Sequence, residues 1–322
     1  MMQAPFPWFG GKSRVAASVW QRFGVAIPNY VEPFCGSAAV LLARPGGAPG
    51  NETVNDADGL LVNFWRAAQH DPEGVAHWAD WPVTEIDLLA RNNWLSANRG
   101  AWTTFLRTDP DFYDVKMAGW WVWGQCCWIG NGWSWAKAAA KLPEVSSNRG
   151  IFSERCRPDL PGAMQLLAER LKDVHIVCGD WRRVLTPACT VDLSGITAVF
   201  LDPPYSLSER EHGLYAVDHP DVAEAVREWA VEHGDDPRFR IALCGYDGEH
   251  DVPGWEPLRW KAKGGYANVG TPGRGRENAE RETVWFSPHC LPGTASQVSM
   301  FEAYQAESPW PGKPFEEDLI GA

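Results

Sequence analysis

The sequence predicts an α/β protein with a mostly parallel sheet and an inserted, mainly helical region. Short apolar runs bounded by turn residues recur along the chain, at 29–34, 52–56, 174–180, 196–202, 240–246 and 282–288. Helical periodicity at 160–173 and 220–233 separates several of these runs, and this alternation is typical of a parallel sheet covered on both faces. Residues 60–159 are Trp-rich and lack a strand rhythm, which predicts the insertion.

Composition excludes several classes of protein. The 322 residues are 45% hydrophobic and 12% aromatic, as in a globular protein and not a disordered one. No apolar run reaches the roughly 18 residues that a membrane span needs, and the first residues lack the pattern of a secretory signal. The eight cysteines show no paired Cys-x-x-Cys spacing, so we expect reduced, mostly buried thiols in a cytoplasmic protein and no metal site.

Charge is unevenly distributed. The net charge of −12 argues against purely electrostatic binding of nucleic acid. Residues 259–281 nevertheless carry six basic side chains against two acidic ones, a local charge of +4, in a Gly-rich stretch that we expect to form a loop near the site. Residues 291–322 are acidic and contain several prolines, which predicts a loosely attached tail.

Acidic residues follow four of the expected strands. In an open parallel sheet, ligands bind beyond the carboxyl ends of the strands, and carboxylates that emerge there from buried strands need partners. A single Asp-Pro pair is more often a simple turn, but four acids at one expected edge favour a binding site: Glu32, Asp56, Asp180 and Asp202.

The stretch 30–42 combines a strand, an acid, a Gly-containing turn and a helix, a pattern that brings backbone N–H groups close to a ligand. Asp56, about twenty residues on, lies where a ribose hydroxyl pair is usually held. A helix N-cap suits Asp58 better than Asp56. Asp180 has two open interpretations: it accepts from an adenine amino group beside Trp181, or it is a cap or turn residue.

Four motifs in order resemble those of the Dam-type adenine-specific DNA methyltransferases: "PWFGGK" (7–12), "VEPFCGS" (31–37), "NDAD" (55–58) and "LDPPY" (201–205). Residues 120–135 and 281–288 resemble the phage and prophage branch. The resemblance implies a Rossmann-like, S-adenosylmethionine-dependent methyltransferase sheet with an inserted helical target-recognition domain. We therefore expect a catalytic domain at 1–59 and 160–290, the inserted domain at 60–159 and the tail at 291–322.

The same resemblance implies the chemistry. The Asp202 carboxylate and the Pro203 carbonyl would accept the hydrogens of an adenine amino group, and two consecutive prolines hold these acceptors stiffly. Tyr205 would offer a ring face to a target base that has left the duplex.

The resemblance also implies a cofactor site for S-adenosylmethionine, whose product is S-adenosylhomocysteine, without a metal. Trp8 would lie near the adenosine and Lys12 would orient the methionine end, while Phe34 and Gly36 would form the turn beneath it. The acids Asp56, Asp180 and Asp202 would complete this site. The family usually has a second glycine where this chain has Ala38; if that position needs a positive φ, alanine costs roughly 1 kcal/mol.

Double-stranded DNA is the expected partner. Tryptophans at mixed spacing are more often core residues than contact residues, but the turn at 130–132 predicts that Trp133 is presented outward. Basic residues at five further positions are expected to contact phosphates or guanine edges: Lys137, Arg149, Lys263, Arg274 and Arg276.

The expected function is site-specific DNA adenine-N6 methylation by a monomer in a bacterial or phage-infected cytoplasm. An RNA adenine methyltransferase and a catalytically silent DNA-binding relic remain alternatives. Enzymes that methylate protein glutamine or the cytosine amino group usually begin the tetrapeptide with Asn or Ser, where this chain has Asp202. A carbohydrate-binding module would explain the 19 tryptophans, but not the ordered motifs.

Overall fold

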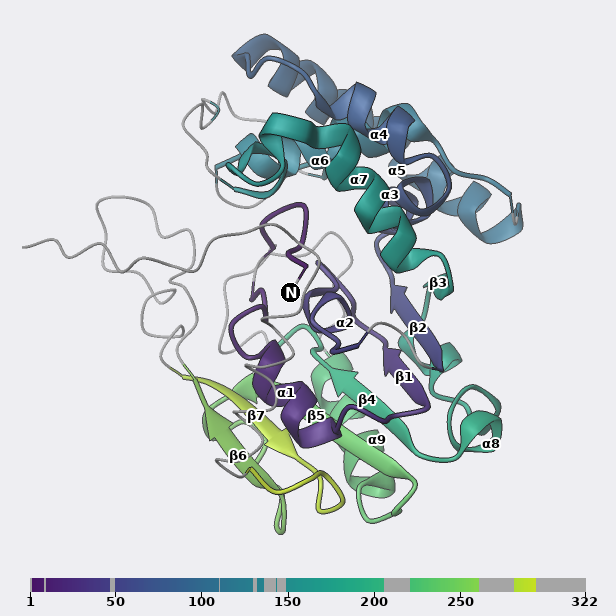
Figure 1. Ribbon diagram of the computed structural model, residues 1–322, viewed down its shortest axis with the longest axis vertical. Coiled ribbons are helices and arrows are strands. Elements are labelled where there is room, and N and C mark those ends of the chain that lie inside the picture. The colour runs from purple at the N-terminus through teal and green to yellow at the C-terminus, as the bar shows by residue number, and fades with distance from the viewer. Residues whose placement is uncertain are drawn as a thin grey trace, which may run out of the picture.

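A seven-stranded sheet organises the part of the chain that the structure describes (Figure 1). The computed structural model describes residues 2–8, 10–46, 50–109, 111–129, 132–135, 143, 149–205, 221–260 and 281–293. The strands are β1 (Asn29–Glu32), β2 (Asn51–Asp56), β3 (Val174–Cys178), β4 (Thr197–Leu201), β5 (Phe239–Tyr246), β6 (Glu256–Arg259) and β7 (Glu282–Phe286).

The sheet order is β3-β2-β1-β4-β5-β7-β6. Strands β1 to β5 are parallel, whereas β7 pairs antiparallel with both β5 and β6. The strand order reverses between β1 and β4, so a topological switch point lies at their carboxyl ends. The expected α/β class and mostly parallel sheet are therefore confirmed.

Each of the six expected strands is present, within two residues of its expected start. Strand β6 was not expected. It has four residues, "EPLR", is mostly exposed and contains Pro257. An edge strand of this kind lacks the apolar run that identifies buried strands, and proline is tolerated only at such an edge.

The two faces of the sheet are buried against different elements. On β4, Ala198 and Phe200 join the cluster around α1 (Ala16–Phe23) and α2 (Ala39–Leu42), while Val199 and Leu201 join the cluster around α9 (Val222–His233). This alternation follows the two-residue period of a strand. The short elements η3 (Trp181–Val184), η4 (Pro187–Cys189) and α8 (Val191–Ser194) connect β3 to β4.

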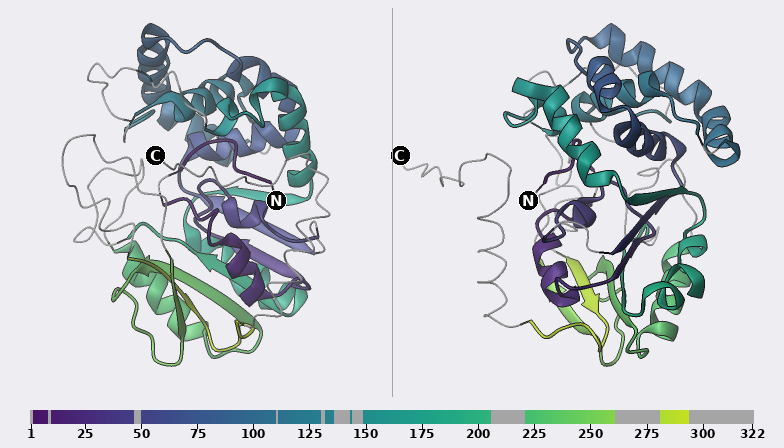
Figure 2. Two further views of the ribbon diagram at one scale, coloured as in Figure 1. Left: turned by 60° about the vertical axis from the view of Figure 1, so that its left-hand side comes forward. Right: turned by 45° about the vertical axis from the view of Figure 1, so that its right-hand side comes forward.

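Between β2 and β3, the described elements are helical. They are α3 (Gly59–His70), α4 (Pro72–Ala79), α5 (Glu85–Thr108), α6 (Val115–Cys127), η1 (Gly150–Phe152), η2 (Arg157–Asp159) and α7 (Leu160–Leu171). Figures 1 and 2 show these helices gathered beyond one side of the sheet. Helix α7 packs against α3 and α4, although its residues were expected in the catalytic domain. The domain division stays a prediction.

Several tryptophans of this helical region form its core. Trp121, Trp123, Trp128 and Trp133 are each at most 4% exposed. The eight cysteines, all within the described ranges, are free thiols, and six of them are buried. None of the described helices combines the length and apolar character that crossing a membrane requires.

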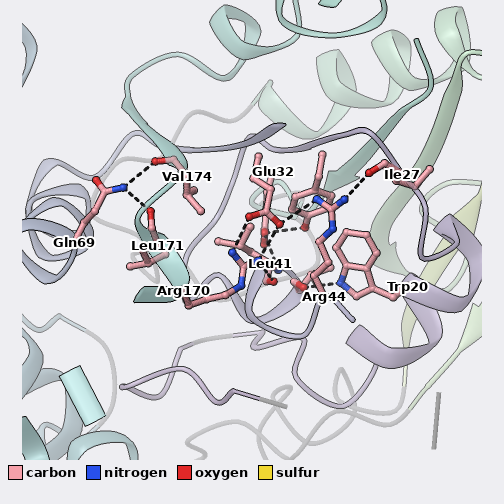
Figure 3. A network of polar contacts seen from close by, with 12 residues as sticks. Trp20, Ile27, Glu32, Leu41, Arg44, Gln69, Arg170, Leu171 and Val174 are labelled. Atoms are coloured by element: carbon pink, nitrogen blue, oxygen red, sulfur yellow. Dashed lines mark hydrogen bonds and ion pairs between the residues drawn. The ribbon is translucent and has the colours of Figure 1, made fainter. Parts of the chain in front are cut away.

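A buried ionic network joins the sheet to the helical region (Figure 3). Glu52 on β2 is 1% exposed and accepts from Arg44, 3.1 Å away, and from Arg170 of α7, at 2.7 Å. Arg170 also donates to the carbonyl of Leu41 in α2, at 2.8 Å. Since β2, α2 and α7 meet at this one carboxylate, its charge fixes their relative positions.

We expect Glu52→Gln to lower the free energy of unfolding by about 3–5 kcal/mol, because it removes the counter-charge of the buried Arg44 guanidinium and of the largely buried Arg170 guanidinium. Glu256→Gln is the matched control: this carboxylate pairs with Arg22 but is 61% exposed, so the loss should stay below about 1 kcal/mol. Urea denaturation measures both. Equal losses in the two variants would contradict this account of the network.

Candidate active site

A cavity of about 540 Å³ opens at the carboxyl ends of the parallel strands. Glu32 and Asp56 are the last residues of β1 and β2, Asp202 follows β4 directly, and Asp180 lies two residues beyond β3. All four acids line this cavity, as expected from their positions after the strands. Its volume is in the range of sites for small molecules and cofactors.

The N-terminal loop forms one wall of the cavity. Trp8 and Lys12 line it together with Gly36 of the turn after β1. Gly36 has φ +46°, and a Cβ at this position would collide with the indole of Trp8. The glycine therefore allows the loop and the turn to meet closely, and substitution by any larger residue would push them apart.

Asp56 binds the turn after β1 and the turn after its own strand, β2. Its Oδ2 accepts from the N–H of Gly36 at 3.1 Å, and its Oδ1 accepts from the N–H of Asp58 at 3.0 Å. Burial raises the pKa of Asp56 to about 6, although these hydrogen bonds oppose the rise. Asp58 caps α3 by accepting from the N–H of Leu60, which confirms that the N-cap is Asp58 and not Asp56.

Phe34 and Asp180 also line the cavity. The rings of Phe34 and Trp181 have centroids 6.0 Å apart, and both line the cavity. Asp180 caps η3 by accepting from the N–H of Arg182, yet it also faces the cavity. The two interpretations of Asp180 are thus compatible. All seven residues expected to bind the cofactor line this one cavity.

Lys12 is the centre of a buried charge cluster. Its ammonium lies 3.0 Å from Asp202 Oδ1 and 3.6 Å from Glu282 Oε2, and it is 4% exposed. Burial alone would lower the pKa of Lys12, but the two carboxylates raise it overall. Burial likewise raises the pKa of Asp202, and the Lys12 ammonium offsets part of that rise.

Glu282 was missed in the sequence. It begins β7, and because β7 runs antiparallel to β5, its first residue lies at the edge where the parallel strands end. A search for acids that follow strands cannot find a residue that starts one. The acid in "RETVWF", directly before an apolar run, was the available signal.

Tyr205 differs from its expected arrangement. Tyr205 is 8% exposed, and the Lys12 ammonium lies 5.4 Å from the centroid of its ring. The centroids of the Tyr205 and Tyr246 rings are 4.6 Å apart. Of the residues after β4 that are described, Asp202 and Pro204 line the cavity, whereas Pro203 and Tyr205 do not. In this arrangement the Tyr205 hydroxyl lies within hydrogen-bond distance of Asp202 and Glu282, and the use of its ring by a target base stays a prediction.

The helical region supplies cavity residues that sequence reasoning did not select: Arg107, Gln125 and Trp135. Trp135 is held by a bridge from α5. Arg99 donates to Asp58 at 2.6 Å and to the hydroxyl of Ser134 at 2.9 Å. Ser134 is fully buried with φ +66°, and its N–H donates to Asn92 at 2.7 Å. This bridge fixes the turn that carries Trp135 relative to the end of β2.

The expectation that Trp133 is presented outward is wrong. Its ring fills the space that a side chain at Gly124 would need, and its indole N–H donates to the carbonyl of Trp121 at 2.9 Å. Arg149 is half-buried beside η1 and is not among the residues that line the cavity. The other expected DNA contacts lie outside the described residues: Lys137, Lys263, Arg274 and Arg276.

Glu32 is a buried carboxyl at the switch point. It is 2% exposed, and its Oε2 accepts from the Tyr30 hydroxyl at 2.8 Å and from the N–H of Leu41 at 3.3 Å. Burial raises the pKa of Glu32 to about 8, because these two hydrogen bonds compensate the lost hydration only in part.

Residues 8–82 match the family model of the D12 class N6 adenine-specific DNA methyltransferases. This match confirms the resemblance to adenine-specific DNA methyltransferases and supports methylation of adenine N6 in DNA as the general activity. It does not distinguish a phage branch. The search of curated proteins gave no match. No group of three or more metal-ligating side chains occurs within the described ranges, and metal-free chemistry stays a prediction.

The pKa of Glu32 predicts a pH-dependent difference in stability. A carboxyl group whose pKa rises from 4.5 to about 8 on folding stabilises the protein fully below pH 4.5, and this contribution is lost as the pH rises through 8. Glu32→Gln keeps an acceptor oxygen but does not titrate. Urea denaturation from pH 5 to 9 should show the variant gaining stability relative to the wild type as the pH rises. A constant difference would exclude this assignment.

The backbone conformation of Ala38 predicts a second effect on stability. It has φ 49°, in the left-handed region, where an alanine is strained. We expect Ala38→Gly to raise the free energy of unfolding by up to about 1 kcal/mol, because the relief of strain exceeds the added chain entropy of glycine. Urea denaturation beside Ala39→Gly provides the comparison: Ala39 is the first residue of α2, and glycine there should be destabilising. A loss of stability in both variants would refute the strain.

Proposed function

We propose that this protein is a site-specific DNA adenine-N6 methyltransferase that uses S-adenosylmethionine and acts on an adenine turned out of double-stranded DNA. The observation that carries this proposal is the position of Asp202. Its carboxylate emerges from β4 into a cavity at the switch point, with Oδ1 bound by Lys12 and no described donor at Oδ2.

The residues around the cavity suit S-adenosylmethionine. Phe34 and Trp181 offer aromatic surface within the cavity, Asp56 has the acceptor oxygens that a ribose needs, and Trp8 lines the cavity wall beside Gly36. When bound, this cofactor supplies an electrophilic methyl group on a sulfonium sulfur. The roles of Trp8, Lys12, Phe34, Gly36, Asp56 and Asp180 in binding it are part of the proposal.

Asp202 would activate the amino group of adenine. The lone pair of that nitrogen is delocalised into the ring, so the nitrogen is a poor nucleophile. Asp202 Oδ2 and the carbonyl of Pro203, which lies between the cavity-lining residues Asp202 and Pro204, would each accept one amino hydrogen, which localises the lone pair for attack. The stiff Asp-Pro-Pro turn keeps these acceptors in place before the base arrives, so little reorganisation is needed.

A base inside a duplex cannot reach Asp202, because the side chain is 21% exposed and faces a recessed cavity. We therefore propose that the target adenine leaves the stack, as in other enzymes that act on a base. Trp135 lines the same cavity from the helical region and offers a further ring surface there. Phosphate contacts by Lys137, Arg149, Lys263, Arg274 and Arg276 would offset the net charge of −12. We propose a monomer.

We expect Asp202→Ala to reduce DNA methylation by about 10²–10³-fold or more, because it removes the charged acceptor. The first measurement is long-read sequencing for N6-methyladenine in DNA from a methylation-deficient bacterial host that expresses the protein. A defined sequence motif should be methylated with the wild type and with Asp236→Ala, an acid that pairs with Arg238 on the surface, but not with Asp202→Ala.

Absence of any DNA mark, while the purified wild type binds S-adenosylmethionine in calorimetry, would contradict DNA methylation and direct the search to RNA. Absence of both the mark and cofactor binding would indicate a DNA-binding relic.

A further inference from the structure

Glu282 contacts two of the groups that surround the Asp202 carboxylate. Its Oε2 lies 2.8 Å from the Tyr205 hydroxyl and 3.6 Å from the Lys12 ammonium. The same two groups approach Asp202 Oδ1, at 3.2 Å and 3.0 Å. The two carboxylates thus share one hydroxyl and one ammonium. They come from β7 and from the end of β4, which are separated by β5 in the sheet.

The hydroxyl distinguishes between the two carboxylates. A phenol has one hydrogen, so Tyr205 donates to one carboxylate at a time. The shorter distance, 2.8 Å, is to Glu282. With that hydrogen held by Glu282, Asp202 is left with Lys12 as its charged partner at Oδ1, and Oδ2 keeps its electron density for another donor.

We propose that Glu282 is a positioning residue for methyl transfer: it holds the Tyr205 hydroxyl and the Lys12 ammonium so that Asp202 presents Oδ2, which has no donor among the described residues, to the amino group of the target base. This inference rests on the proposed function.

Charge supports the same role. Lys12 contributes one positive charge and the two carboxylates contribute two negative charges, so the cluster has a surplus negative charge when both are ionised. The amino nitrogen of the substrate becomes positive as its lone pair bonds to the methyl carbon and the bond from that carbon to the sulfonium sulfur breaks, which leaves a neutral thioether. The nitrogen then gives up one hydrogen as a proton to water. A fixed negative charge near this nitrogen stabilises that change, and in a cavity it is weakly screened.

Removing Glu282 has a specific consequence for Asp202. Without the charge of Glu282, the Tyr205 hydrogen would turn to Asp202 Oδ1, because a carboxylate is a stronger acceptor than a neutral group. The ammonium of Lys12 would then also be left to that oxygen. Asp202 would then be a weaker acceptor, although the cavity residues that face the cofactor would stay in place. The effect should fall on the chemical step and not on binding.

The test is Glu282→Gln, which keeps an acceptor oxygen for Tyr205 and removes the charge. The substrate is unmethylated DNA that carries the motif recognised by the wild type. Under single-turnover conditions on this DNA, we expect the rate of methyl transfer to fall about 10- to 100-fold. The KM for DNA and the Kd for S-adenosylmethionine should stay within about 3-fold of the wild type, since a contact made in the transition state affects the rate alone. Glu256→Gln, on the neighbouring strand β6, should keep the wild-type rate.

Two further measurements separate positioning from a general structural role. The loss in Glu282→Gln combined with Tyr205→Phe should be smaller than the product of the two single losses, because Gln weakens the contact that Phe deletes. The fluorescence of 2-aminopurine at the target position reports the extrusion of the base without chemistry, and the signal with Glu282→Gln should match that with the wild type.

Glu282→Asp keeps the charge but shortens the side chain. This variant should retain cofactor binding and lose rate, and it replaces Glu282→Gln in the test if the Gln variant does not fold.

An unchanged rate in folded Glu282→Gln or Glu282→Asp would overturn this inference while the proposed function stands. Parallel losses of rate, DNA affinity and cofactor affinity would also overturn it, because they indicate a structural role. A wild type that binds the cofactor but methylates no DNA would overturn the proposed function, and this inference with it.

Discussion

The ammonium of Lys12 lies between two buried carboxylates, and this contact joins segments that are far apart in the chain. Lys12 comes from the N-terminal loop, Asp202 from the end of β4 and Glu282 from the start of β7. Two carboxylates in a buried site need a cation nearby, because desolvation strongly disfavours their charged forms. The loop that carries Lys12 also carries Trp8 onto the turn after β1. One ion cluster therefore fixes both the reactive carboxylate and a wall of the cavity.

Much of the fold was predictable because the central strands are apolar on both faces and short turns bound them. The acids at or just beyond the ends of β1, β2, β3 and β4 were predictable for a related reason: a carboxylate that emerges from a buried strand needs a function or a partner. Two features could not be predicted from apolar runs and the acids at their ends. Strand β6 is exposed and carries Pro257, so it has no apolar pattern. Glu282 depends on the direction of β7, which the sequence does not encode locally.

The tryptophans show a similar limit. Their abundance predicts a large buried aromatic core, but not which rings remain at a surface. Trp133 is in the core because Gly124, nine positions earlier, leaves space for it, while Trp135 lines the cavity two residues later. The left-handed conformation of Ser134 between them turns the chain from one environment to the other. A Gly-containing turn indicated that a ring would face outward, and only tertiary contacts decide which ring.

The bridge from Asp58 through Arg99 to Ser134 limits how the two parts of the chain can be recombined. Asp58 lies two residues beyond β2 and caps α3, whereas Arg99 and Ser134 belong to the helical region. A helical region taken from another protein would have to bring its own cation to Asp58, or the cap of α3 would keep an uncompensated charge. The helical region is thus not an interchangeable module: its exchange requires a matched residue on the sheet side of the junction.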